Sequence, residues 1–253
     1  MEGLSSASSA SVAERPSNEG LTRDRGTADD GDVPSALSIS ATVVALSAAP
    51  APNAAPPGYG IAHGERPTRL YASPNGAVIT RLSTSTEFGS PQTLGVVRQR
   101  GRWLAVVSTL RPNERLGWIR ARAVRVTRTQ VNLVLDLSRR RLLLREGDRV
   151  VRRMTVGIGR ASSPTPVGRF AVTDKLSGSR YGPYYGCCIV ALSAHQPNLP
   201  AGWTGGDRIA IHGTNAPWTI GVPSSAGCPH ASDADLRVLM RRVPLGAPVF
   251  IRS

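Results

Sequence analysis

The sequence has few cysteines, and they form no pattern that binds a metal or cross-links a small domain. There are three in 253 residues: Cys187, Cys188 and Cys228. Adjacent Cα atoms lie about 3.8 Å apart, below the usual disulfide span, so we expect no bond between Cys187 and Cys188. The odd count leaves at least one free thiol, and no Cys-x-x-Cys pair is present. The chain is therefore no disulfide scaffold, and a structural zinc site is not expected.

Lysine is nearly absent and aromatic residues are scarce. Of 31 basic residues only Lys175 is a lysine, and Phe, Trp and Tyr together make up 5% of the chain. The net charge of +14 divides into −4 for residues 1–58 and +18 for the rest. So basic a surface favours polyanions, although coding bias alone also produces arginine-rich chains. No stacking-aromatic or basic-helix motif accompanies the charge, so nucleic-acid binding has no other support.

The chain also lacks an apolar run that would span a membrane comfortably. The best candidate is residues 36–49 (ALSISATVVALSAA), which are Ser-rich and too short. They resemble the apolar region of a signal peptide, but three aspartates (Asp29, Asp30 and Asp32) stand where such a signal carries positive charge. The alternative is an Ala/Ser linker. We predict that residues 1–58, rich in Ser, Ala, Pro and Asp, are disordered.

Residues 59–127 predict a small all-β domain. Glycine (26) and proline (20) are abundant, which favours short strands and turns over long helices. Strands are expected near residues 69–72, 77–82, 95–97, 103–107 and 117–126. The segments LYASPNGAVITRL, GRWLAVV and GWIRARAV resemble a bacterial SH3-like domain, which implies peptide or wall binding at most. Trp103 and Trp118 are expected in its core or groove wall.

Residues 128–253 predict a second, mainly β domain with one helix. Strands are expected at residues 131–137, 141–145, 150–157, 169–173, 208–212 and 249–251. Near the end, apolar residues recur at helical spacing and predict one buried stripe: Leu236, Leu239, Met240 and Val243. Ser232 precedes this helix, and Asp235 three residues later completes a capping box.

Cys228 and His212 are the candidate nucleophile and base. The thiolate is the form that attacks, so a nucleophilic cysteine needs a base or positive dipole within hydrogen-bond reach. Cys228 lies in the segment SAGCPH, where Gly227 lets the backbone approach a substrate closely. His212 ends a predicted strand 16 positions earlier. Taken alone, a cysteine is more often a buried apolar residue, and a strand-end histidine is usually structural.

Several ordered motifs over residues 130–253 resemble the L,D-transpeptidase catalytic domain of the YkuD type. The opening VNLVLDLSRRRLLLREGDRVVRRMTVGIG is similar to that family's first hairpin, and SPTPVGRF matches its TPxG-x-F signature. IHGTNAPWTIG matches its IHGT block, and the cysteine motif follows at the expected distance. The resemblance implies a YkuD-type β-sandwich and a peptidoglycan L,D-transpeptidase that cross-links stem peptides through a cysteine thioester, without a cofactor.

The family's motif implies a role for each matching residue. Cys228 would attack the carbonyl of a donor stem peptide, His212 would take the thiol proton, and the Gly213 carbonyl would orient the imidazole. The amides of Gly227 and Cys228 would form the oxyanion hole. Three side chains are expected to contact the substrate: Ser225, His230 and Tyr184.

The cysteine motif departs from the family in part. The family usually reads Ser-His-Gly-Cys, then Ile or Val, then Arg, whereas this chain has Ala226 for the His and Pro229-His230 where the Arg is expected. His230 replaces the Arg only partly, since its charge depends on pH and it lacks the bidentate guanidinium. The core reaction is kept in this prediction, while substrate choice and rate stay open.

Two alternatives remain at this point. In an L,D-carboxypeptidase, water would resolve the thioester on the same Cys and His. A non-catalytic wall-binding protein would use neither. The expected partners are peptidoglycan stem peptides and, through the basic surface, an anionic wall polymer. We expect a monomer outside the cytoplasm, in the cell wall or periplasm, with no specific nucleic acid.

Overall fold

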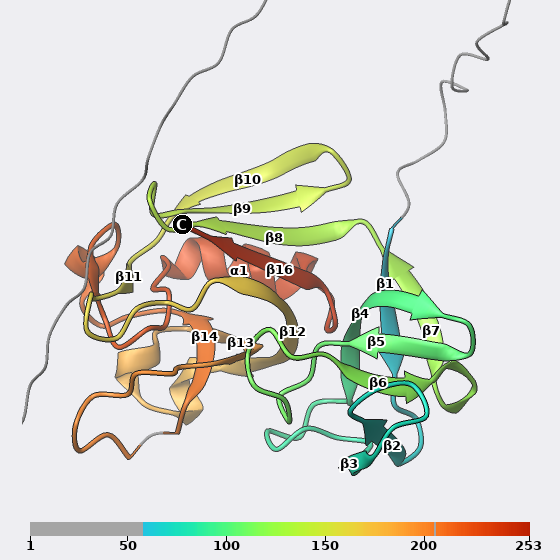
Figure 1. Ribbon diagram of the computed structural model, residues 1–253. Helices are drawn as coiled ribbons and strands as arrows, with labels where there is room; N and C mark the ends of the chain where they lie inside the picture. The colour runs from blue at the N-terminus through green and yellow to red at the C-terminus, as the bar shows by residue number, and fades with distance from the viewer. Residues whose placement is uncertain (1–57, 205) are drawn as a thin grey trace, which may run out of the picture. The chain divides into compact units, whose positions relative to one another are not determined.

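Two seven-stranded sheets follow each other along the chain in the computed structural model, which describes residues 58–204 and 206–253 (Figure 1). The first sheet ends at Thr129 and the second begins at Val131. The predicted mainly β fold with one α-helix is confirmed. The predictions of disorder or a signal region within residues 1–57 lie outside the described residues. In the described ranges, no helix is long and apolar enough to cross a membrane.

The first sheet has the order β3-β2-β6-β5-β4-β1-β7, and all neighbouring strands are antiparallel. Its strands are β1 (Tyr59–His63), β2 (Thr68–Tyr71), β3 (Val78–Leu82), β4 (Thr93–Arg100), β5 (Trp103–Val106), β6 (Gly117–Arg120) and β7 (Arg125–Thr129). The 3-10 helix η1 (Ala121–Ala123) breaks the strand expected over residues 117–126, because the chain must leave β6 and cross to β1, the partner of β7. Strand β1 was not predicted, and the SH3-like assignment stays a prediction.

Both faces of the first sheet are covered in its central strands. Leu104 and Val106 of β5 belong to the inner core, whereas Trp103 and Ala105 belong to a cluster on the opposite face. This alternation is the period of two that strand geometry imposes. Trp103 and Trp118 are 4% and 7% exposed, so the prediction that they are buried is confirmed.

The second sheet has the order β10-β9-β8-β16-β12-β13-β14, in which only β8 and β16 are parallel. Its strands are β8 (Val131–Asp136), β9 (Arg141–Glu146), β10 (Arg149–Thr155), β12 (Gly168–Ser177), β13 (Cys188–His195), β14 (Arg208–His212) and β16 (Pro248–Arg252). Strands β11 (Ile158–Gly159) and β15 (Pro223–Ser225) form a separate parallel pair. Three 3-10 helices complete this part: η2 (Gly178–Arg180), η3 (Pro183–Tyr185) and η4 (Pro217–Thr219).

Helix α1 (Asp233–Arg242) packs against the second sheet and has the predicted cap. Ser232 Oγ accepts the backbone N–H of Asp235 at 3.2 Å and donates to its carboxylate at 2.8 Å. Leu236, Leu239 and Val243 are fully buried in one core with leucines of β8 and β9. Aspartates in the first turn and arginines in the last complement the helix dipole. The helix therefore fixes the chain that directly follows Cys228.

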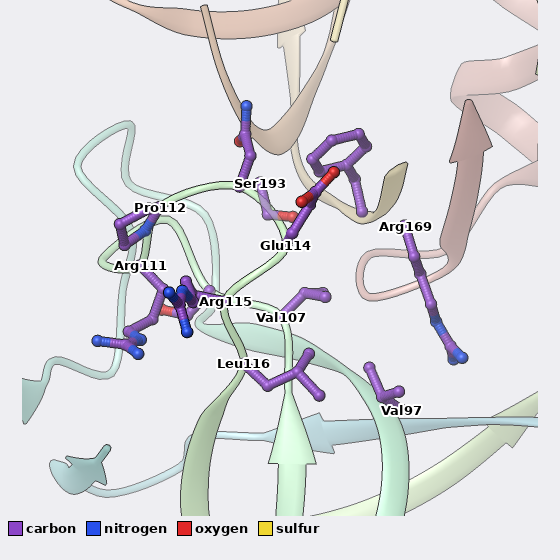
Figure 2. Close-up of a pocket in the computed structure, with 12 residues that line it drawn as sticks. Val97, Val107, Arg111, Pro112, Glu114, Arg115, Leu116, Arg169 and Ser193 are labelled. Carbon is purple, nitrogen blue, oxygen red and sulfur yellow. The ribbon is translucent and has the colours of Figure 1, made fainter. Parts of the chain in front are cut away.

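A cavity of about 270 Å³ lies where residues 108–116 meet β12 (Figure 2). Val97, Val107 and Leu116 give it an apolar side, and Glu114 lies near Ser193 across from them. Neither a cysteine nor a histidine lines it. We therefore place the candidate site elsewhere, at the end of β14.

Candidate active site

Cys228 lies in a tight loop between β15 and α1. Gly227, the preceding residue, has φ of +122°, a conformation that residues with a Cβ rarely adopt. A Cβ atom there would also overlap the side-chain amide of Gln196. Thr165 donates its hydroxyl to the Gly227 carbonyl at 2.7 Å. Both backbone conformation and packing therefore require glycine before the cysteine.

The thiol of Cys228 contacts the backbone of β14. Its Sγ accepts the N–H of Ala210 at 3.4 Å and lies 3.9 Å from the carbonyl oxygen of Arg208, to which it donates. Burial raises the pKa of the Cys228 thiol to about 11, and the Ala210 hydrogen bond opposes that rise in part. At neutral pH the side chain is therefore a thiol and not a preformed thiolate.

His212, the last residue of β14, is 1% exposed and held on both backbone and side-chain atoms. Its N–H donates to the Pro229 carbonyl at 3.1 Å, and its own carbonyl accepts the Ala231 N–H at 2.9 Å. The ring Nδ1 lies 2.6 Å from the Gly213 carbonyl oxygen. Because a carbonyl can only accept, Nδ1 carries the hydrogen and Nε2 is the nitrogen that can take a proton.

The imidazole of His212 is neutral at physiological pH. Burial is the largest cause that lowers its pKa, to about 4; His230 lowers it further, and the Gly213 hydrogen bond opposes both. The rings of Tyr184, Tyr185 and His230 surround it, with centroids 5.6, 4.9 and 4.8 Å from that of His212. The site therefore pairs a neutral base with a neutral thiol.

His212 and Cys228 line the same cavity of about 60 Å³. Tyr184, Leu199 and Trp203 also line it and are partly exposed at its mouth. Within the described part of the chain, no hydrogen bond joins the Cys228 thiol to His212; the thiol points to Arg208 instead. The thiol hydrogen must therefore leave the Arg208 carbonyl before it can pass to the imidazole, and such tightening on substrate binding is common at catalytic sites.

The two N–H groups predicted to form the oxyanion hole differ in whether they already have an acceptor. The Gly227 N–H donates to Ser225 Oγ at 3.1 Å, so it is already used inside the loop. The Cys228 N–H has no acceptor in residues 58–204 and 206–253. Of the two predicted donors, Cys228 alone is available to a developing oxyanion.

Comparison with known proteins identifies the part of the chain that carries this site. Residues 130–251 match the family model YkuD, the L,D-transpeptidase catalytic domain. A putative L,D-transpeptidase YkuD of Bacillus licheniformis is 30% identical over 121 residues, which are 47% of this chain and 64% of that protein. A probable L,D-transpeptidase YbiS of Escherichia coli is 29% identical over 120 residues, 41% of this chain and 38% of that protein. Residues 130–251 therefore resemble a YkuD-type L,D-transpeptidase catalytic domain.

The matches concern this domain and not whole proteins. The chain spans less than two thirds of the length of the curated relatives it matches. A crystal structure of L,D-transpeptidase 3 from Mycobacterium tuberculosis with a faropenem-derived adduct covers 55% of this chain and 73% of its own. Its sequence identity is 19% and its TM-score 0.39, too low to support an argument.

Of the three side chains expected to touch substrate, only Tyr184 lines the cavity that contains Cys228 and His212. It is 42% exposed, and burial, followed by the nearby Cys228 and Tyr185, raises its phenol pKa. Ser225 is buried, and its hydroxyl accepts the Gly227 N–H, so it shapes the loop instead. A contact of Ser225 with substrate therefore stays a prediction, while its hydroxyl is engaged inside the loop.

The same expectation for His230 also stays a prediction, and the structure places this side chain outside the cavity lining. The side chain is 3% exposed and lies behind His212, away from the cavity lining. Its Nδ1 lies 3.1 Å from Thr219 Oγ1, and its buried Nε2 has no hydrogen-bond partner among the described residues. Burial lowers the pKa of His230, so it does not supply a fixed cation. In this domain the position that the family gives to Arg is filled by a neutral packing residue.

Gln196 and Thr165 organise the cysteine loop, and sequence reasoning missed both. The Gln196 side-chain amide donates to the carbonyls of Ala226 at 2.9 Å and Pro164 at 3.0 Å. Thr165 binds Gly227 and also accepts the Gly159 N–H. Thr165 lies in the matched SPTPVGRF motif, which was the available signal. Gln196 lies outside every motif, so nothing in one sequence marks it.

One further expectation is corrected. Cys187 and Cys188 form a disulfide, contrary to the expectation that adjacent cysteines do not pair, and Cys228 is the free cysteine. His195 has partners on both ring nitrogens, Asp207 at 2.9 Å and the Thr109 carbonyl at 2.7 Å. Over the described residues, no cluster of three His, Cys, Asp or Glu side chains could hold a metal ion.

Proposed function

We propose that the chain is a peptidoglycan L,D-transpeptidase that acts outside the cytoplasm and joins two stem peptides through a thioester on Cys228. The observation that carries the proposal is the arrangement of Cys228 and His212 on one cavity, with Nδ1 of His212 fixed by the Gly213 carbonyl. The fixed tautomer leaves Nε2 as the base. The relatives' names point to the same activity.

Acylation uses these groups in order. The Cys228 Sγ attacks a carbonyl carbon of the donor stem peptide as its hydrogen passes to His212 Nε2. The Cys228 N–H donates to the oxyanion that forms. When the tetrahedral intermediate collapses, the carbon–nitrogen bond breaks, and the leaving amino acid takes the proton from His212. A thioester and a neutral imidazole remain.

Resolution reverses the proton path. The amine of a neighbouring stem peptide attacks the thioester carbon and gives a proton to His212 Nε2. The carbon–sulfur bond then breaks, and the proton returns to the Cys228 sulfur. The products are a new peptide bond and the original thiol, so neither a cofactor nor an external redox partner is used.

The pKa values favour proton transfer during attack over a resting ion pair. The pKa of Cys228 is about 11 and that of His212 about 4, so the neutral pair is the stable form. General-base catalysis of this kind takes the proton in the transition state. Tyr184, Leu199 and Trp203 at the cavity mouth give a peptide an apolar wall next to the sulfur.

The test is product analysis with the full chain. We expect a disaccharide tetrapeptide incubated with the enzyme to give a dimer. The mass of this dimer should equal two monomer masses minus the mass of one released terminal amino acid. Cys228→Ser should give none. A tripeptide alone would reassign the enzyme as an L,D-carboxypeptidase. Equal wall binding by wild type and Cys228→Ser, with no product from either, would favour the non-catalytic alternative and end the proposal.

A further inference from the structure

The outer face of the first sheet carries a set of arginines in register across its strands. Arg100 of β4 lies opposite Trp103 of β5, which lies opposite Arg120 of β6. Arg69 of β2 lies opposite Arg81 of β3. Arg98 of β4 lies opposite Ala105, in the same outer cluster as Trp103. We call these the arginine face: Arg69, Arg81, Arg98, Arg100 and Arg120.

Strand alternation places all five on the side away from the inner core. Leu70 and Leu104 belong to that core, so their neighbours Arg69 and Trp103 face outwards. With about 4.8 Å between strands, the five strands from β3 to β4 spread these cations over roughly 19 Å. The arginine face is therefore longer than a single anion, and its length matches a ligand with several linked anionic groups.

Buried indole rings hold two of the guanidiniums in place. Arg120 lies over the Trp103 ring at 4.0 Å and Arg98 over Trp118 at 5.5 Å from the centroid. Tyr71 packs edge-on against Trp103 at 4.9 Å. Cation–π contacts of this kind fix the direction of the side chain and leave its N–H donors free.

Among the residues that the structure describes, no acidic side chain neutralises the arginine face. In the described ranges, none of its five side chains forms a salt bridge. Strands β2 to β6 contain no Asp or Glu. Of the three glutamates in residues 58–129, Glu65 is paired with Arg125 and Glu87 with Arg208.

A basic cavity continues this surface at one edge. Its volume is about 500 Å³, and its lining includes Arg66, Arg81 and Arg122 with no acidic residue. Arg81 belongs to both the cavity and the arginine face. Guanidinium groups bind phosphate in a bidentate way, so the cavity adds donors for the same kind of ligand.

We infer that the arginine face binds a polyanion with regularly spaced phosphodiesters, a poly(alditol phosphate) chain of the cell wall. The choice of a wall polymer rests on the proposed function. The choice over nucleic acid rests on the rings: single-strand binders offer aromatic faces for base stacking, whereas Trp103 and Trp118 are covered by guanidiniums. The arginine face recognises the charge and spacing of phosphates and offers no ring for base stacking.

The experiment measures binding of poly(glycerol phosphate) to the full chain at several salt concentrations. The triple variant Arg69→Gln/Arg98→Gln/Arg100→Gln should bind at least tenfold more weakly. The slope of log K against log salt should fall by about 2, since each lost contact to a flexible single-stranded polyanion removes about 0.7. The matched control Arg141→Gln/Arg153→Gln/Arg241→Gln removes the same charge from exposed sites of the second domain and should keep wild-type affinity.

The outcomes decide the inference. Equal weakening in both triple variants would show a general charge effect and overturn it, as would no binding by wild type. Single-stranded DNA with the same number of phosphates, bound as tightly, would overturn the assignment to a wall polymer. Cys228→Ser should bind poly(glycerol phosphate) as tightly as wild type. Polymer binding is therefore tested separately from the proposed reaction at Cys228, and either proposal can fail without the other. Unchanged alkylation of Cys228 by iodoacetamide in the arginine-face variant shows that it is folded.

Discussion

Gln196 donates its side-chain amide to the carbonyl of Ala226 at 2.9 Å, two residues before the cysteine. The same nitrogen donates to Pro164 at 3.0 Å, so one amide joins the residue after β13 to both the cysteine loop and the segment between β11 and β12. Gln196 is 5% exposed and packs against Gly227, where no side chain would fit. It is therefore a positioning residue for Cys228, supplied by a loop far from the cysteine in sequence.

Replacing Gln196 should slow the chemistry of Cys228. Gln196→Ala removes both hydrogen bonds and lets the loop shift, and misplacement by about 1 Å costs up to roughly a hundredfold in rate. We expect acylation by a carbapenem, followed by intact mass, to slow by roughly tenfold to a hundredfold. Gln99→Ala, an exposed change in β4, is the matched control and should acylate at the wild-type rate.

A second substitution separates positioning from loss of packing. Gln196→Glu keeps the shape but, when ionised, has no hydrogen to donate. The acylation rate of this variant should approach that of wild type as the pH falls, because the protonated carboxylic acid regains one hydrogen-bond donor. A deficit that is the same at every pH would mean that Gln196 only fills space.

The pH dependence of acylation follows from the neutral pair. His212 has a pKa of about 4 and must be unprotonated to act as a base, so activity is present above that value and lost below it. Cys228 stays a thiol until about pH 11. We expect a rate that is flat between these limits and falls with a midpoint near pH 4. A midpoint near the ordinary histidine value of about 6.5 would contradict the buried neutral imidazole.

The free energy of unfolding should decrease as the pH is lowered, because of the same depressed pKa of His212. Between about pH 6.5 and 4, the unfolded chain binds a proton at His212 that the folded chain does not, so acidification favours unfolding. The full effect of this group is roughly 3 kcal/mol at 1.36 kcal/mol per pKa unit. Urea unfolding at pH 7.5 and 4.5 should therefore show a smaller pH effect in His212→Gln than in wild type. Equal effects would exclude His212 as a cause.

The sequence predicted the parts of the fold and site that depend on local patterns. Helix α1, its Ser232 cap and most strands follow from periodicity and turns. The ordered motifs predicted Cys228 and His212 as a pair, and both line one cavity in the structure. Contacts between distant loops carry no such pattern. Gln196 acts through the backbone carbonyls of other segments. The Gly227 N–H donates to the Ser225 hydroxyl two residues away, a local contact that the motif did not indicate. The burial of His230 depends on Tyr184 and His212, which only the folded chain brings together.

Replacing His230 with the Arg that the YkuD motif carries at this position should destabilise the protein. His230 is buried beside His212 with its Nε2 unpaired, so His230→Arg would place a charge there without an acidic partner. An uncompensated buried charge costs on the order of 3 kcal/mol. We expect a loss of that size in the free energy of unfolding in urea. His230→Gln, which can keep the Thr219 hydrogen bond, is the control and should lose much less; an arginine variant as stable as wild type would show that the side chain finds an exit to solvent.

The first sheet supports the cysteine loop through the residue next to Gln196. Asn113 binds the backbone of His195 twice: its amide nitrogen donates to the carbonyl at 2.7 Å, and its oxygen accepts the N–H at 2.9 Å. Asn113→Ala leaves both groups unpaired, at a cost of roughly 1–3 kcal/mol, and frees the chain that carries Gln196. We expect Asn113→Ala to be acylated more slowly by a carbapenem and to have a lower free energy of unfolding than wild type. Asn113→Asp should lie between Asn113→Ala and wild type, because it keeps the acceptor and loses the donor. If Asn113→Ala acylates at the wild-type rate while Gln196→Ala is slow, the cysteine loop is held by the second domain alone.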